Sequence, residues 1–240
     1  MDNPKITTIV VIICIIILGL YAAGEVNYYS SKIAIEKNID SPVVTIPTIG
    51  IEEKINNVSL SQGVMHDAKS FTPTNGDVIL SGHRTLQGSP FLRLNELNNG
   101  DIITLEWPGI GEVNYTVINK TIVEPTARIN TQNNGTHIYL ITCDPIGSTA
   151  HRLIIEGELS DVGPINDKII QNNPHESYAL IITTAFLVIG LIFSYFYPKD
   201  NRIYILTIVL IISAILFYFY LFPIDSNIIY EKILWLNGGM

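Results

Sequence analysis

The stretch Thr136–Leu159, THIYLITCDPIGSTAHRLIIEGEL, decides the fold of this chain. Apolar and β-branched residues fill both of its halves, and Pro145–Ser148 between them favours a reversal of the chain. The pattern therefore predicts two antiparallel strands joined by a short turn. In such a hairpin the end of the first strand lies beside the start of the second, so Cys143 and Arg152 become neighbours. A thiol and a guanidinium are brought together at the turn end.

Cys143 is predicted to be a free thiol. The only other cysteine, Cys14, lies within a long apolar segment, too far away to form a disulfide. An unpaired cysteine in an oxidising compartment is a liability unless its reactivity is used, so Cys143 is a candidate nucleophile. The alternative is a small buried hydrophobic residue at a strand end.

Three apolar segments account for the 48% hydrophobic content and the mean hydropathy of +0.33. The first, Ile6–Ala23, is uncharged and long enough to cross a bilayer. A cleaved signal peptide is the alternative, but the apolar core is long and only Lys5 precedes it, which favours an uncleaved anchor. The other two, Tyr178–Tyr197 and Ile203–Phe222, are separated only by Pro198–Arg202 and are predicted to form a transmembrane helical hairpin.

The flanking charges predict the orientation of these segments. Lys5, Lys199 and Arg202 lie on one side if all three segments cross the membrane, and they indicate the cytoplasmic face. The region between, residues 25–177, is then extracellular; it has 10 basic and 18 acidic residues, a net charge of −8, and no basic patch for nucleic acid. The expected division is an anchor at 1–24, a stalk or linker at 25–40, a β-domain at 41–160, a linker at 161–177, a helical hairpin at 178–223 and a tail at 224–240.

The extracellular region is predicted to be mainly β. Short β-rich runs bounded by Pro, Gly, Asn or Asp alternate with few helical windows, which is typical of a closed barrel or a sandwich. One short helix is expected at Pro90–Leu97, where apolar residues recur every three positions. The expected strands include Val43–Ile46, Gly76–Leu80, Asp101–Leu105 and Val113–Val123.

His83 is the strongest candidate for the base that a cysteine nucleophile needs. It follows the predicted strand Asp77–Ser81, and Gly82 gives the backbone room to turn, so His83 is expected on the rim of a rigid scaffold. A solvated loop histidine is the alternative. Four other histidines are less suitable, because they lie in polar segments, far along the strand, or on the opposite face: His66, His175, His137 and His151.

Other roles for the charged residues stay open at this level. Arg152 has an alternative as an ordinary partner of Glu156 or Asp144. No Cys-X-X-Cys or His-X-X-X-His spacing indicates a zinc site, and no cofactor is expected. Three acidic residues are candidates for a calcium site or, alternatively, a solvated face: Asp67, Asp77 and Asp101.

Several motifs occur in an order and spacing similar to those of the sortase family, over about Ser41–Leu159. They are Ile46–Ile51, Leu80–Arg84, Phe91 with Leu94 and Leu97, Gly100–Asp101, Leu140–Cys143 and Arg152–Ile154. The family's usual Thr-Leu-X-Thr-Cys has Tyr139 in its first position here, which bears on substrate fit more than on chemistry. The C-terminal hairpin is a second departure from the usual single anchor, and it places the resemblance closest to class D/E-like or archaeal sortases.

The resemblance implies an eight-stranded β-barrel and a cysteine transpeptidase. Cys143 matches the family's nucleophile, His83 its general acid/base, and Arg152 its oxyanion-stabilising or substrate-positioning arginine. The implied partners are secreted proteins with a C-terminal sorting signal, an amine acceptor on the cell envelope or a pilin, and membrane lipid, with no nucleic acid. A hydrolytic cysteine peptidase and a non-catalytic surface β-domain that binds an envelope partner are the alternatives.

Overall fold

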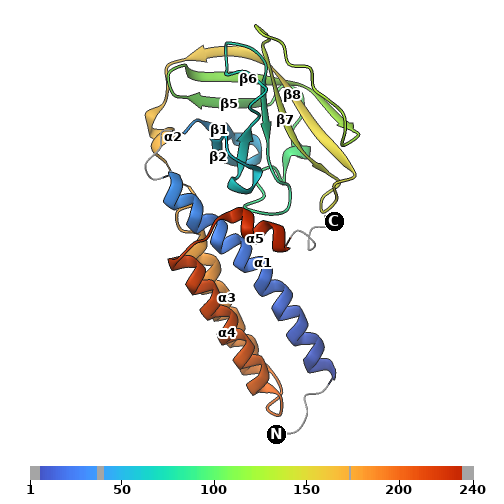
Figure 1. Cartoon of the computed structure of the whole chain (residues 1–240), viewed down its shortest axis with the longest axis vertical. Helices are drawn as coiled ribbons and strands as arrows, with labels where there is room; N and C mark the ends of the chain where they lie inside the picture. The colour runs from blue at the N-terminus through green and yellow to red at the C-terminus, as the bar shows by residue number, and fades with distance from the viewer. Residues whose placement is uncertain (1–5, 37–40, 173, 234–240) are drawn as a thin grey trace. The chain divides into compact units, whose positions relative to one another are not determined.

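The computed structural model describes residues 6–36, 41–172 and 174–233, which form two compact units (Figure 1). The helical unit comprises the described residues of 1–34 and 175–233, and the barrel unit comprises those of 35–174. The helices come from both ends of the chain, and the strands come from the middle. Each unit is therefore described by itself.

Eight strands close into a barrel in the order β1-β2-β3-β4-β7-β8-β6-β5. This confirms the predicted mainly β fold with an eight-stranded barrel. Closure leaves no strand edge unpaired, which suits a domain made of many short strands. The strands are β1 Val43–Ile46, β2 Ile51–Asn56, β3 Val64–His66, β4 Val78–Ser81, β5 Ile102–Trp107, β6 Gly111–Val123, β7 His137–Asp144 and β8 His151–Gly163.

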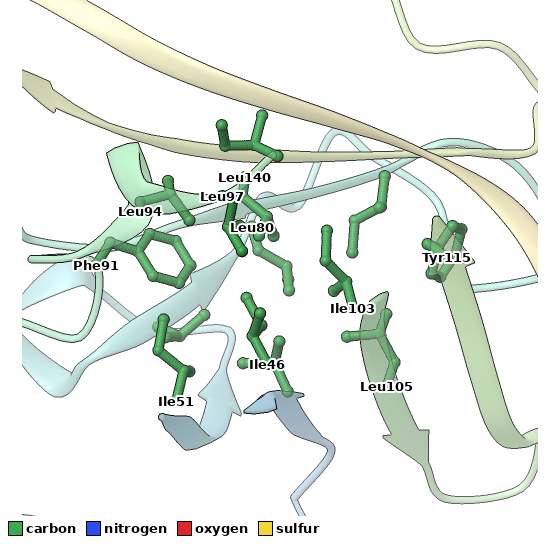
Figure 2. Packing of buried hydrophobic residues seen from close by; sticks show 14 of the residues in the cluster. Ile46, Ile51, Leu80, Phe91, Leu94, Leu97, Ile103, Leu105, Tyr115 and Leu140 are labelled. Atoms are coloured by element: carbon green, nitrogen blue, oxygen red, sulfur yellow. The ribbon is translucent and has the colours of Figure 1, made fainter. Parts of the chain in front are cut away.

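The inner face of the barrel holds one hydrophobic core, shown in Figure 2. Leu80 of β4 and Leu140 of β7 point into it, and both are fully buried. Because side chains alternate along a strand, the burial of Leu140 and Thr142 turns Ile141 and Cys143 to the outer face of the barrel. The core therefore fixes the side of the sheet on which the thiol lies.

The prediction of one short helix over Pro90–Leu97 is wrong in the type and length of the helix. The segment forms turns and one short 3₁₀ helix, η3 Leu94–Glu96. Phe91, Leu94 and Leu97 are all fully buried, so the spacing of three correctly indicated a common buried face. A 3₁₀ turn has three residues per turn, which fits this spacing as well as a short α-helix does.

The helical unit has three helices that are long and apolar enough to cross a membrane, as predicted. The helices are α1 Ile6–Glu36, α3 Tyr178–Phe196, α4 Arg202–Leu221 and the shorter α5 Ser226–Ile233 (Figure 1). α3 and α4 approach closely at Gly190, where an added Cβ would lie 2.4 Å from Val209. Small residues permit such close helix contacts in membranes.

The part of α1 that extends beyond the apolar segment carries polar side chains that contact the segment following α4. The side chain of Asn27 is fully buried, donates to the Ile224 carbonyl at 3.0 Å and accepts from the Ile224 amide at 2.8 Å. The hydroxyls of Ser31 and Ser226 lie 2.8 Å apart. These contacts give the buried Asn27 side chain and the Ser31 hydroxyl hydrogen-bond partners within the helical unit.

Candidate functional site

The β7–β8 hairpin places Cys143 beside Arg152. The two strands are antiparallel, and Cys143 pairs with Arg152 in the register of the ladder. This confirms the predicted hairpin and its register. Paired residues on neighbouring strands present their side chains to the same face of a sheet. The thiol and the guanidinium therefore both belong to the outer face of the barrel.

His83 reaches the same end of the sheet from the other side of β7. β4 runs parallel to β7 with Ser81 opposite Ile141. Beyond the end of β4, the Gly82 amide donates to the Ile141 carbonyl at 3.1 Å, and the Thr142 hydroxyl donates to the Gly82 carbonyl at 2.8 Å. Continuing the β4–β7 register two residues beyond Ser81 and Ile141 sets His83 opposite Cys143. The structure thus brings His83, Cys143 and Arg152 to one end of three adjacent segments.

The backbone around His83 is held by close packing. A Cβ on Gly82 would lie 2.7 Å from the ring of Phe91, so this position has room only for glycine. The Phe91 amide in turn donates to the His83 carbonyl at 3.1 Å. Burial of the imidazole lowers the pKa of His83 to about 4, because a charged ring is poorly solvated there. His83 is therefore neutral at neutral pH.

The lowered pKa of His83 predicts a pH-dependent stability. Between pH 6.5 and 4 the unfolded chain protonates this histidine and the folded chain does not, so the free energy of unfolding decreases as the pH falls through this window. The shift from 6.5 to about 4 corresponds to a loss of at most about 3 kcal/mol. Urea unfolding of the detergent-solubilised chain at pH 4 to 7, compared with His83→Gln, measures this contribution. Parallel stability curves for the two proteins would contradict it.

Arg152 does not pair with either carboxylate that the sequence offered as an alternative. Its Nη1 donates to the Thr149 carbonyl at 3.0 Å and to the His151 carbonyl at 3.1 Å, both in the turn before β8 or at its start. Nε and Nη2 have no hydrogen bond within the described part of the chain. Since a guanidinium has five N–H donors, these two nitrogens remain available to a ligand.

Arg84 is the residue that the sequence analysis missed. Its side chain is only 5% exposed, and its Nη1 donates to the Cys143 carbonyl at 3.1 Å and to Asp144 Oδ1 at 2.5 Å. Its Nη2 donates to Asn95 Oδ1 at 2.8 Å. Arg84 therefore anchors the strand end that carries the thiol. The only sequence signal was its place next to His83.

His66 lies elsewhere than expected. It ends β3 and is not in a polar loop. Its Nε2 lies 3.0 Å from the Phe71 carbonyl and 3.1 Å from the Ser70 hydroxyl, and its ring packs against Trp107. These contacts give His66 a structural role in the turn between β3 and β4.

A groove of about 470 Å³ lies on the outer face of the barrel, and Arg152 is the candidate residue that lines it. Ile79, Ile141 and Ile154, from β4, β7 and β8, line it together with Arg152. The β3–β4 loop contributes Lys69. The β6–β7 loop contributes Ala127, Arg128, Ile129 and Thr131. Ile141 is two residues before Cys143 on the same face of β7, so the groove extends along β7 toward the strand end that carries the thiol.

The acidic residues considered for calcium serve the chain's own backbone. Asp67 accepts from the Lys69 amide, and Asp101 accepts from the Asn98 amide. Asp77 is 2% exposed and accepts from the Gln132 amide at 2.8 Å and the His137 amide at 3.0 Å. Within residues 6–36, 41–172 and 174–233, no group of three His, Cys, Asp or Glu side chains is arranged to hold a metal ion.

Comparisons with known proteins identify the family of the barrel unit. A family model described as a sortase domain matches residues 34–160. The lid mutant of sortase A from Corynebacterium diphtheriae is 25% identical over 52% of this chain and 73% of its own, with a TM-score of 0.47. Sortase C-1 from Actinomyces oris is 28% identical over 52% and 76%, also with a TM-score of 0.47. The comparison with curated proteins gives no match.

Proposed function

The chain belongs to the sortase family, and we propose that it is a membrane-anchored cysteine transpeptidase with His83, Cys143 and Arg152 as its catalytic residues. It cleaves a C-terminal sorting signal of secreted proteins and transfers the acyl group to an amine of the cell envelope or of a pilin. The register that pairs Cys143 with Arg152 and brings His83 to the same strand end is the observation that supports this most.

The first half of the reaction forms an acyl-enzyme. The neutral imidazole of His83 takes the proton of the Cys143 thiol, and the sulfur attacks the carbonyl carbon of the scissile amide. Arg152 donates hydrogen bonds to the oxygen as it becomes negative. The C–N bond breaks, His83 returns the proton to the departing amine, and a thioester remains on Cys143.

The second half transfers the acyl group to the acceptor. An incoming amine attacks the thioester carbon, and His83 accepts a proton from that nitrogen. The C–S bond breaks, the new amide forms, and the proton returns to the thiol. Because His83 is neutral at neutral pH, it is in the protonation state that each half-reaction needs as a base.

The three apolar helices suit an enzyme held at the membrane. In this topology α1, α3 and α4 cross the bilayer, and the barrel lies on the extracellular side. Lys199, in the short connection between α3 and α4, and Arg202, the first residue of α4, then lie on the cytoplasmic side, as the positive-inside rule expects. Anchoring enzyme and substrate in one membrane raises their effective concentration.

Product analysis tests the proposed reaction. The full chain in detergent is incubated with a pool of peptides that contain Pro- and Thr-bearing sorting signals, with and without an added primary amine. Transpeptidation predicts a mass-identified amide product that requires the amine. Cleavage at an equal rate without the amine, giving only the acid, would identify a hydrolytic peptidase. No product, together with vinyl sulfone labelling of Cys143 no faster than that of free cysteine, would favour a non-catalytic binding domain.

A further inference from the structure

The groove beside the candidate active site is basic, although the domain around it is acidic. Residues 41–160 have 7 basic and 12 acidic residues, a net charge of −5. Three cationic residues nevertheless line the groove, Lys69, Arg128 and Arg152, against a single acidic one, Asp67. Asp67 already accepts a hydrogen bond from the Lys69 amide at 2.8 Å. The local charge is therefore opposite to that of the domain.

Neither Lys69 nor Arg128 is neutralised by the protein. Both side chains are exposed, and no carboxylate lies within salt-bridge distance of either one in the part of the chain that the structure describes. Apolar isoleucines line the groove between the loops that carry these two cations. An occupant that complements the groove has apolar side chains and a negative charge.

Hydrogen bonds connect the loops that carry the two cations to the barrel. On the side of Lys69, the Ser70 hydroxyl donates to the Asp67 carbonyl at 2.8 Å and accepts from the Ile79 amide at 3.1 Å. On the side of Arg128, the buried Asp77 carboxylate accepts from the backbone amides of Gln132 and His137. These hydrogen bonds tie one loop at Ser70, next to Lys69, and the other at Gln132, four residues after Arg128.

We propose that Lys69 and Arg128 bind a carboxylate side chain of the sorting signal, so that this enzyme selects an acidic peptide. The inference rests on the proposed function and adds the substrate class. An extended peptide rises about 3.3 Å per residue, and Ile141 lies two residues from Cys143 on the same face of β7. An Asp or Glu a few residues from the scissile bond therefore lies beside the groove walls while apolar neighbours cover the isoleucines.

Matched peptide pairs test this selection. Each pair is identical except for Glu or Gln at one position near the scissile bond, and the pool scans that position. Two exposed cations facing one carboxylate predict a preference for Glu of roughly 3- to 10-fold in kcat/KM. Raising the salt to 0.5 M weakens the preference, since exposed charges are screened.

Variants of the groove residues test whether the groove causes the preference for Glu over Gln peptides. Lys69→Gln combined with Arg128→Gln brings the Glu:Gln ratio of kcat/KM close to one. The two peptides are compared on the same variant, so a general change in turnover cancels in this ratio. Lys168→Gln, an exposed lysine on α2 (Asp167–Gln171) that does not line the groove, keeps the wild-type ratio. An equal loss of preference in Lys168→Gln would show a diffuse field of the domain and would overturn the assignment.

The two proposals fail in different ways. Equal turnover of Glu and Gln peptides at every position, with transpeptidation intact, overturns the acidic substrate class and leaves the transpeptidase standing. Absence of turnover with every peptide contradicts the transpeptidase. In that case fluorescence polarisation of the same labelled pairs on the Cys143→Ala chain decides the charge preference alone. A Glu preference in binding that survives the Lys69 and Arg128 replacements overturns it.

Discussion

Replacing Cys143 with alanine abolishes transpeptidation, with a loss of roughly 10³-fold or more in kcat. The sulfur is the only group on this face that is proposed to form a bond to the substrate, and neither His83 nor Arg152 can replace it. Liquid chromatography with mass spectrometry measures the loss of the amide product. The same instrument detects the acyl-enzyme as a mass added to the wild-type chain.

The second cysteine provides a matched control. Cys14 lies in α1 and is also a free thiol, so Cys14→Ala removes one sulfur without touching the barrel. It keeps both the activity and the substrate adduct. Cys143→Ala loses both, and Cys143→Ser keeps the geometry with a much weaker nucleophile. A substrate adduct that persists in Cys143→Ala would remove Cys143 from the proposed role.

Local patterns in the sequence carried the parts of the site that are close along the chain. β7 and β8 are joined by a short turn, so alternating apolar residues and Pro145–Ser148 were enough to predict the register of Cys143 and Arg152. The roles of these residues were implied by the family resemblance and remain proposals. The structure adds which face of the sheet they occupy.

The pairing of strands that are distant along the chain could not be predicted from the sequence pattern. β4 and β7 are parallel neighbours, although about 60 positions separate their paired residues, such as Ser81 and Ile141. Strand periodicity says which residues share a face and does not say which strand lies alongside. β3 has only three residues, Val64–His66, which is too short for a periodic signal, and for this reason His66 was expected in a loop.

The burial of a charged side chain also could not be predicted from the sequence. Arginine is rarely fully buried unless it is paired, so nothing in the composition marked Arg84 as an interior residue. Its partners, the Cys143 carbonyl and the Asp144 carboxylate, are 59 and 60 positions away. Its burial is decided by the pairing of β4 with β7. That pairing brings Arg84 into contact with the last residues of β7.

Replacing Arg84 with methionine destabilises the barrel by roughly 3 kcal/mol, because removing one partner of a buried ion pair leaves the other uncompensated. The Asp144 carboxylate, whose side chain is 20% exposed, loses its cation, and the Cys143 carbonyl loses a donor. Since this carbonyl belongs to the proposed nucleophile, kcat also falls in the chains that remain folded. Urea unfolding and transpeptidation rates measure the two effects.

The matched variants separate the buried pair from charge in general. Arg93→Met removes an exposed arginine whose ion pair with Glu96 is solvated, and we expect little change in stability from losing that pair. Arg84→Lys keeps the charge but lacks the planar fork that reaches Asn95, Asp144 and the Cys143 carbonyl together, so it restores only part of the stability. Adding Asp144→Asn to Arg84→Met removes the uncompensated carboxylate and recovers part of the loss. If Arg84→Met is as stable and as active as Arg93→Met, this anchor does not hold the strand end that carries Cys143.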